Sequence, residues 1–404
     1  MTDTDWWGPE SNSQKEKSPD NNQINGSGMS AVLANQSDGY QNSIQEGIDD
    51  GAHAVIDLDA AAFNLSVVRA MAPDSKVMAV VKANAYGHGA VEIARTLAHA
   101  DGFGVARIAE ARQLRDAGIV NPITLLEGFT DQPQLMKIIE IMADVVVHSM
   151  VQVDLLKRTG FSGNIWVKVT SGMNRLGFPL DMLPRVLHEL RKYKVLGIMT
   201  HLANADMDTS ATQRQIELFY KGVSEFGLPV SIANSAGIIR HPETRTDWIR
   251  PGLMLYGVSP FPGQQSADLQ TVMTLNAPVI AINRVRAGES VGYGSMWTAP
   301  VDCRVAVLAI GYADGYPWGT GNPRCVLLGG LRRQIVGRIS MDMTCIVLED
   351  EDDVQLSERA ILWGDRLPVE EVALASGSIA YTLLCQVGHR VTRVYVGDSE
   401  DAAE

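Results

Sequence analysis

The sequence predicts an α/β protein: a TIM (β/α)8 barrel followed by a mostly β C-terminal domain. From His53 onward, short apolar segments alternate with amphipathic segments, as in a parallel sheet whose strands are joined by helices. After about residue 270, β-prone runs punctuated by glycine replace that alternation. The predicted boundaries are 1–50 for an N-terminal tail, 51–272 for the barrel, 273–397 for the β domain and 398–404 for a second tail.

The barrel prediction depends on eight short apolar runs. These are Val77 to Val81, Phe103 to Ala106, Ile123 to Leu126, Val145 to His148, Ile165 to Val169, Gly197 to Thr200, Val230 to Ala233 and Trp248 to Arg250. The segments between them repeat apolar residues at helical spacing, including Ala90 to Ala100, Ala109 to Ala117, Leu135 to Met142, Leu180 to Arg191 and Gln213 to Phe226. Eight alternations within about 200 residues predict a closed barrel.

The two ends of the folded region differ from the barrel in composition. Arg304 to Ile310 and Thr344 to Leu348 are β-prone runs of the second domain, and no low-complexity linker precedes it, so the domains are expected to pack closely. Residues 1–50 are rich in Asn, Ser, Gln, Asp and Gly, which predicts a disordered tail. Met29 is a plausible internal start, and Trp6 and Trp7 are the tail's paired aromatic residues.

Composition narrows the range of partners and compartments. A net charge of −13 over 404 residues argues against a nucleic-acid or anionic-membrane partner, because both require a basic face. The four cysteines are far apart and lack CxxC spacing, so neither a metal site nor a disulfide framework is expected. The chain has no signal-like start and no run of about 18 apolar residues. We therefore expect a cytoplasmic protein.

Lys82 is the residue most indicative of chemistry. It follows an apolar run in AVVKANAYGHGA, residues 79–90, and opens a polar turn that contains glycine. An isolated lysine at a strand end usually extends its ammonium to solvent. The small and hydrogen-bonding residues after Lys82 favour a different interpretation, in which a desolvated amine forms a Schiff base with a phosphate-bearing aldehyde.

Other polar residues also follow predicted strands, where TIM barrels carry their active sites. They are Lys168 with Arg175, His201 with Asn204, Asn234 with Ser235, and Arg250. The loops after the seventh and eighth strands are candidates for phosphate binding through backbone N–H groups, although each alone could be a simple tight turn.

The Lys82 segment resembles the pyridoxal-phosphate lysine motif of alanine racemases, and the resemblance extends from about His53 to Val396. It implies pyridoxal 5'-phosphate as cofactor, with its phosphate held by Tyr86, Ser235, Gly252, Leu253 and Tyr381. The wider set of implied cofactor contacts adds Lys82, Arg175, His201, Asn234 and Arg250. Arg250 matches the arginine that the family directs at the pyridine nitrogen, which weakens the ring as an electron sink. The alternative is a structural arginine paired with a carboxylate such as Asp247.

KVTSGMNRLGF, residues 168–178, resembles the family's motif after the fifth strand. The resemblance implies that Arg175 contacts the cofactor's phenolic oxygen and the substrate carboxylate. It also implies that Lys168 is a site of possible carbamylation. Thr170 and Ser171 depart from the commonest form, which has Asp followed by Thr or Ser.

Racemisation needs a proton acceptor on one face of Cα and a donor on the other. VGYGSMWTA, residues 291–299, resembles the family's second-base motif and nominates Tyr293, with His201 as its hydrogen-bond partner. In the family this tyrosine reaches the barrel of a second subunit in a head-to-tail homodimer. The resemblance extends to Met341 and Asp342 as substrate-carboxylate contacts and to Tyr312 and Tyr316 at the entrance. In YTLLCQVGHRVTRVY, Thr382 and Thr392 replace the more frequent Glu and Pro.

These observations predict an enzyme that interconverts L-alanine and D-alanine by a two-base mechanism with Lys82 and Tyr293, supplying D-alanine for peptidoglycan. A broader-specificity amino-acid racemase stays open, because side-chain tolerance depends on pocket volume. A basic amino-acid decarboxylase of the same fold is disfavoured, since such enzymes usually place a glutamate where Arg250 stands. A non-catalytic carrier of the cofactor is disfavoured by the complete second domain.

Overall fold

The protein is described here by a computed structural model covering residues 51–261, 263, 267–318 and 324–397. Both predicted tails, with Met29, Trp6 and Trp7, lie outside these residues. Eight parallel strands close into the barrel: β2 (Lys76–Val80), β3 (Gly102–Val105), β4 (Ile123–Leu125), β5 (Asp144–Val147), β6 (Asn164–Lys168), β7 (Lys194–Met199), β8 (Val230–Ser231) and β9 (Trp248–Ile249). Pairing of β2 with β9 closes it, so the predicted barrel is confirmed, with strand bounds shifted by at most three residues.

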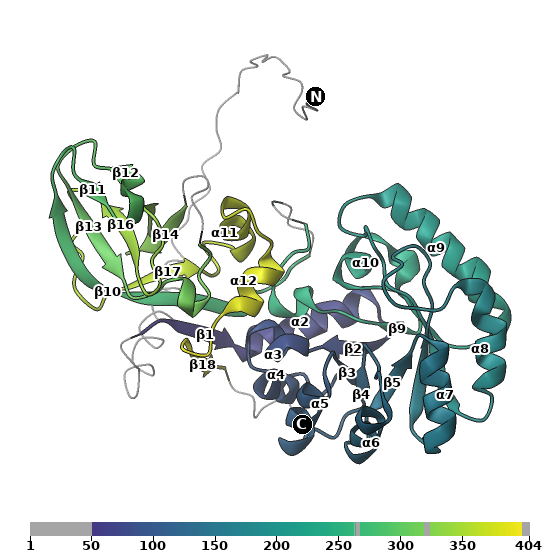
Figure 1. The fold of residues 1–404 in the computed structure, drawn as a ribbon. Coiled ribbons are helices and arrows are strands. Elements are labelled where there is room, and N and C mark those ends of the chain that lie inside the picture. The colour runs from purple at the N-terminus through teal and green to yellow at the C-terminus, as the bar shows by residue number, and fades with distance from the viewer. Residues whose placement is uncertain (1–50, 262, 264–266, 319–323, 398–404) are drawn as a thin grey trace, which may run out of the picture. The chain divides into compact units, whose positions relative to one another are not determined.

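Helices follow the strands and cover the outside of the barrel (Figure 1). They are α2 (Leu58–Met71), α3 (Lys82–Tyr86), α4 (Ala90–Thr96), α5 (Ile108–Asp116), α6 (Gln132–Glu140), α7 (Met150–Thr159), α8 (Leu183–Glu189), α9 (Thr209–Val223) and α10 (Ser235–Arg240). Short 3₁₀ turns are η1 (Leu180–Met182), η2 (Ser224–Phe226), η3 (Pro242–Thr244) and η4 (Leu253–Tyr256). Helix starts obey local chemistry: Asp131 precedes α6 and accepts the Gln134 N–H at 2.8 Å.

The barrel strands are buried on both faces, as expected for a parallel sheet covered by helices. In β5 the sequence DVVV is buried throughout. The interior contains Met78, Val146, Trp166 and Met199, so this part of the barrel is a packed core. The Trp166 ring meets Trp248 edge-on at a centroid distance of 5.7 Å. Such packing makes the strand ends rigid supports for functional side chains.

The β domain is an eight-stranded sheet in the order β13-β16-β15-β14-β17-β10-β1-β18. Its strands are β1 (His53–Asp57), β10 (Met273–Val285), β13 (Cys303–Leu308), β14 (Cys325–Leu328), β15 (Leu331–Val336), β16 (Thr344–Leu348), β17 (Arg359–Trp363) and β18 (Thr392–Val396). A separate hairpin joins β11 (Ser290–Val291) to β12 (Trp297–Thr298), flanking η5 (Tyr293–Ser295). The remaining elements are η6 (Tyr312–Asp314), α11 (Val369–Ala375) and α12 (Ala380–Gln386).

One predicted boundary needs correction. Residues 51–272 were assigned to the barrel, but β1 pairs antiparallel with β10 and parallel with β18, so the first described strand belongs to the C-terminal sheet. The assignment followed the order of the chain, whereas strand pairing joins segments more than 200 residues apart. The chain therefore begins its described part in the β domain and then enters the barrel through α2 (Figure 1).

Among the described residues, no helix has both the length and the apolar character that a membrane span requires. No group of three or more His, Cys, Asp or Glu side chains in the same part of the chain is arranged to hold a metal ion.

Candidate active site

Basic side chains gather at the carboxyl ends of the barrel strands. Lys168 ends β6, and the positive charges of Arg250, Arg175 and Lys82 all act on it. Burial and then these charges lower the pKa of Lys168 to about 8. The same charges, after burial, hold the pKa of His201 well below its ordinary value. The structure thus brings together five residues predicted from sequence, in a cluster suited to a multiply charged anion.

Lys82 begins a turn of unusual backbone conformation. Ala83, Asn84, Ala85 and Tyr86 all have φ between 51° and 54°, so α3 is a left-handed turn. Each such residue costs roughly 1–2 kcal/mol unless it is glycine. Hydrogen bonds fasten the turn, including Gly89 N–H to Asn84 C=O at 3.0 Å and Arg393 Nε to Gly87 C=O at 2.7 Å. A run of strained residues that the surroundings hold in place is typical of functional sites.

Arg250 is buried without an ion pair in the described chain. Its side chain is fixed by the Ser231 hydroxyl, by the Thr200 carbonyl at 2.5 Å and by the Ile232 carbonyl at 3.2 Å. Asp247 instead accepts the Val230 N–H at 2.8 Å. The alternative of a structural Arg250–Asp247 pair is therefore wrong. Burial lowers the pKa of Arg250 to about 10, so the guanidinium remains charged at neutral pH.

A compact polar cradle joins the loops after β8 and β9. The buried Ser235 hydroxyl accepts the N–H groups of Gly252 at 3.1 Å and Met254 at 3.3 Å. Asn234 caps α10 by accepting the Gly237 N–H at 2.9 Å, and Leu253 is buried at the start of η4. A Cβ at Gly252 would lie only 2.6 Å from the Tyr86 hydroxyl, so this position requires glycine.

Three aromatic rings line the other side of this cradle. Tyr86 lies between Tyr256, at a centroid distance of 4.9 Å, and Tyr381 on α12, at 6.0 Å. Burial raises the pKa of Tyr86, and that of Tyr381 to about 12, so both phenols stay protonated. Sequence reasoning missed Tyr256, whose hydroxyl donates to the Val80 carbonyl at 2.8 Å and whose ring stacks on His88. Only its position three residues after Leu253 could have suggested it.

The departures from the family's motifs have defined structural roles. Thr170 Oγ1 accepts the Asn174 N–H at 2.9 Å and so organises the loop that carries the exposed Arg175. Ser171 lies 2.9 Å from the Thr200 hydroxyl. Thr382 lies within α12, and Thr392 begins β18 opposite His53.

The β-domain candidates lie mostly at the surface of the chain. Tyr293 is 71% exposed and Met341 is 53% exposed, while Asp342 and Tyr312 are also exposed. Tyr316 needs correction as an entrance residue, because it is 1% exposed and its ring stacks on Trp363 at 6.2 Å. Nothing in the sequence GYADGYPW indicates that the side chain of its second tyrosine, Tyr316, is buried.

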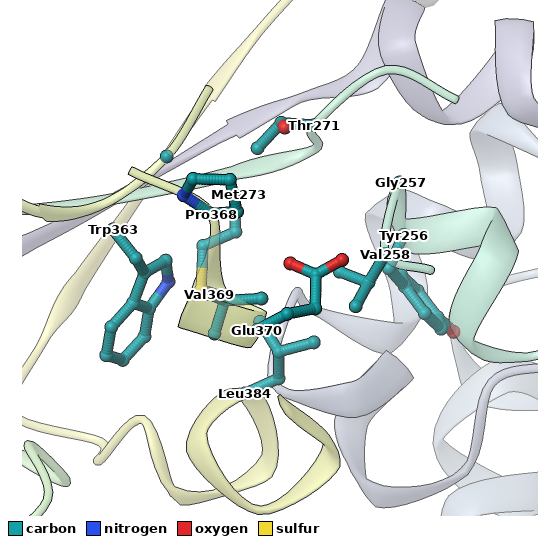
Figure 2. A pocket seen from close by; sticks show the side chains of 11 residues that line it. Tyr256, Gly257, Val258, Thr271, Met273, Trp363, Pro368, Val369, Glu370 and Leu384 are labelled. Carbon is teal, nitrogen blue, oxygen red and sulfur yellow. The ribbon is translucent and has the colours of Figure 1, made fainter. Parts of the chain in front are cut away.

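A cavity is lined by residues from both the barrel and the β domain (Figure 2). Trp363 and Glu370 line it, together with Tyr256, whose ring also contacts Tyr86. Glu370 accepts the Ser259 N–H at 2.9 Å, which links α11 to the loop after η4. The cavity lining contains none of the cationic residues, so the cavity adjoins the candidate active site only through Tyr256.

The fold is a (β/α)8 barrel joined to a β domain, with a cluster of cationic side chains at the carboxyl ends of the barrel strands. The alanine racemase N-terminal domain family matches residues 56–260, and the alanine racemase C-terminal domain family matches residues 272–395. An alanine racemase of Coxiella burnetii (strain CbuG_Q212) is 42% identical over 354 residues, covering 84% of this chain and 97% of that protein.

Solved structures agree. The alanine racemase from Acinetobacter baumannii has a TM-score of 0.82 at 37% identity, covering 86% of this chain and 100% of that one. The alanine racemase from Bartonella henselae, solved with covalently bound pyridoxal phosphate, has a TM-score of 0.80 at 30% identity over the same shares. This chain belongs to the alanine racemase family. It is a pyridoxal-phosphate-dependent isomerase, so the predicted family, fold, enzyme class and cofactor are confirmed.

Proposed function

We propose that this protein racemises alanine with Lys82 and Tyr293 as the two proton-transferring groups. When bound, pyridoxal phosphate supplies an aldehyde for amines and an electron-accepting ring that acidifies the Cα–H bond. The protein must then hold a base on each face of Cα. The observation that carries the proposal is Lys82 itself, which leaves the barrel core on a constrained turn within a cluster of cations.

The residues present fit the cofactor's charge and shape. Ser235, Gly252 and Tyr86 meet at this cradle so closely that a Cβ at Gly252 would lie 2.6 Å from the Tyr86 hydroxyl. The N–H groups of Gly252 and Met254 donate to the Ser235 hydroxyl in this structure, and we infer that they would donate to phosphate oxygens when the cofactor binds. We infer that Tyr381, Asn234 and Leu253 complete this phosphate site. The nearby cations offset the phosphate's negative charge.

Arg250 would face the cofactor's ring nitrogen with a fixed, charged guanidinium. Its three acceptors hold it in one orientation. A permanent donor at that nitrogen prevents the ring from gaining a proton, which limits charge delocalisation and favours return of the proton to Cα. This supports a racemase over a decarboxylase of the same fold.

Arg175 would bind the substrate's carboxylate, and Lys168 would orient Arg175. A pKa of about 8 leaves an appreciable fraction of Lys168 uncharged at neutral pH. We infer that this amine can react with carbon dioxide, forming a carbamate whose negative charge would orient Arg175. Burial and the surrounding cations keep His201 neutral. Its imidazole would form a hydrogen bond with the Tyr293 phenol.

The second subunit of a head-to-tail homodimer would supply Tyr293. A tyrosine that is 71% exposed is not enclosed by its own barrel, and further exposed apolar side chains occur in the same domain: Met296, Tyr312, Trp318, Met341 and Met343. Such surface is typical of an interface. The partner we propose is a second copy of this chain, whose Tyr293, Tyr312, Met341 and Asp342 complete the site. D-alanine made there would supply peptidoglycan.

Single substitutions test the two bases. Lys82→Ala should abolish covalent attachment of the cofactor, and Tyr293→Phe should retain attachment but lose turnover of L-alanine, followed by polarimetry. Tyr220→Phe is the matched control, because its hydroxyl donates to the Glu243 carbonyl on the outside of the barrel. Normal racemisation by Tyr293→Phe would remove the second base from the mechanism.

Mixing the two inactive variants tests whether the site is shared. In a hybrid dimer, the intact Lys82 of one subunit meets the intact Tyr293 of the other at one of the two sites. Random mixing should therefore restore about a quarter of the wild-type activity. If mixtures stay inactive while hybrid dimers form, Tyr293 does not act across the interface. A panel of L-amino acids would reveal broader specificity.

A further inference from the structure

One carboxylate on α5 holds three backbone N–H groups. Glu110 Oε2 accepts the N–H of Ala106 at 2.8 Å and of Arg107 at 2.9 Å, which caps the start of the helix. Glu110 Oε1 accepts the N–H of Ala83 at 2.7 Å. Ala83 directly follows Lys82 and is the first left-handed residue of the turn. A helix cap is thus also a tether for the segment that carries the proposed cofactor lysine.

The next two helices show what a cap alone requires. Gln134 on α6 accepts the Thr130 N–H at 3.0 Å, and Gln152 on α7 accepts the His148 N–H at 2.7 Å. Both span four residues, as Glu110 does with Ala106. In each glutamine, the amide nitrogen faces an acceptor: the Thr130 hydroxyl at 2.8 Å or the Phe129 carbonyl at 2.9 Å.

Glutamine cannot serve at position 110 in the same way. There the second side-chain atom faces the Ala83 N–H, which is a donor, so only a second oxygen fits. A charged acceptor also makes the stronger hydrogen bond. Glutamine therefore stands at positions 134 and 152, where the side chain caps a helix, and glutamate stands at position 110, where it must also accept the Ala83 N–H.

The hydrogen bond from Ala83 to Glu110 matters because the turn has a strained backbone conformation. Alanine favours right-handed helix, yet Ala83 and Ala85 are left-handed here. Without external bonds, the segment would relax and change the direction in which Lys82 leaves the strand. We propose that Glu110 is a positioning residue for Lys82, holding the left-handed turn in the conformation that presents the amine to the cofactor. This inference rests on the proposed role of Lys82.

Three variants of the holoenzyme separate tethering from capping. Glu110→Gln keeps one oxygen for the cap but turns an NH₂ group toward Ala83. Gln134→Ala removes a cap of the same geometry that lies away from the turn. Glu110→Ala removes both functions. The measurements are thermal unfolding, amide hydrogen exchange of residues 82–90, the rate at which cofactor is released to an external scavenger, and kcat against KM.

We expect Glu110→Gln to unfold at nearly the wild-type temperature. Its turn amides should exchange about tenfold faster than in the wild type, and its cofactor should be released about tenfold faster. A tenfold change is what the loss of one charge-assisted hydrogen bond would produce. The loss of activity in Glu110→Gln should appear mainly as a lower kcat, with KM little changed. Gln134→Ala should leave the turn, cofactor release and kcat unchanged. Equal turn exchange and cofactor release in Glu110→Gln and Gln134→Ala would overturn the proposal.

A measurement on the wild type does not depend on any variant folding. The Ala83 amide should be protected from exchange about as strongly as the Arg107 amide, since both donate to Glu110. Free exchange at Ala83 would refute the tether directly. If instead Lys82→Ala still attached cofactor covalently, the role of Lys82 would fail while the exchange data still reported on Glu110.

Discussion

Gly252→Ala should destabilise the cofactor-free protein by about 2 kcal/mol, within the usual range for overpacking. The added Cβ would lie 2.6 Å from the Tyr86 hydroxyl and 3.2 Å from Cζ. An ordinary contact begins near 3.4 Å, so the hydroxyl must retreat by about 0.8 Å. Tyr86 has little room, because it is 8% exposed and lies between the rings of Tyr256 and Tyr381.

The assay is urea unfolding at fixed protomer concentration, in a double-mutant cycle with Tyr86→Phe. Removing the hydroxyl leaves only the 3.2 Å contact, so the cost of Gly252→Ala should fall to about 1 kcal/mol in that background. Gly51→Ala is the control, because a Cβ there meets nothing within 4 Å. The steric reasoning would be refuted if the changes in unfolding free energy caused by Gly252→Ala and Tyr86→Phe were additive. It would also be refuted if Gly252→Ala lowered the unfolding free energy no more than Gly51→Ala does.

Three further predictions concern charge. Arg333→Met should lower the free energy of unfolding by about 1–3 kcal/mol, because the Asp352 carboxylate loses its ion pair and keeps the Glu349 N–H as a hydrogen-bond donor; urea unfolding should show a smaller loss when Asp352→Leu is added. Burial lowers the pKa of His88 to about 4, so the folded state binds fewer protons than the unfolded state below about pH 6.5. The free energy of unfolding should therefore fall as pH drops from 6.5 toward 4, by at most about 3 kcal/mol from this group, and His88→Gln should flatten that slope. Finally, ¹³C-bicarbonate at pH 8 should produce a carbamate carbon resonance that Lys168→Arg lacks; the same resonance in both proteins would assign it elsewhere.

The barrel was predictable because its strands and helices have hydrophobic patterns that can be recognised within short segments of the sequence. Parallel strands buried on both faces appear as continuous apolar runs, as in β5, and the helices between them repeat apolar residues at helical spacing. Even β8 and β9, only two residues long in the structure, lie within runs predicted from sequence. The strand His53–Asp57 was not predicted to join the second sheet, because its partners β10 and β18 are distant in sequence. Pairing between distant segments has no local pattern.

The candidate site divides in a similar way. Residues at strand ends were found because barrel geometry places them at one rim, where the charge of Arg250 acts on both Lys168 and His201. Tyr256 escaped notice because its role comes from stacking on His88 rather than from any motif. Tyr316 was misplaced because burial of one ring in a turn depends on a distant partner, Trp363.

The turn after Lys82 is where local preference and tertiary structure disagree most. Two alanines, the best helix formers, adopt the left-handed conformation that glycine would adopt freely. Replacing Ala83 or Ala85 by glycine would relieve that strain but would also let the turn sample other conformations, which loosens the direction of Lys82. Alanine has fewer accessible backbone conformations than glycine. An alanine turn held by Glu110 and by Arg393 therefore gives Lys82 a narrower orientation than a glycine turn would. Sequence rules fail at this segment because its conformation is imposed by residues 27 and 306 positions away from the groups they hold.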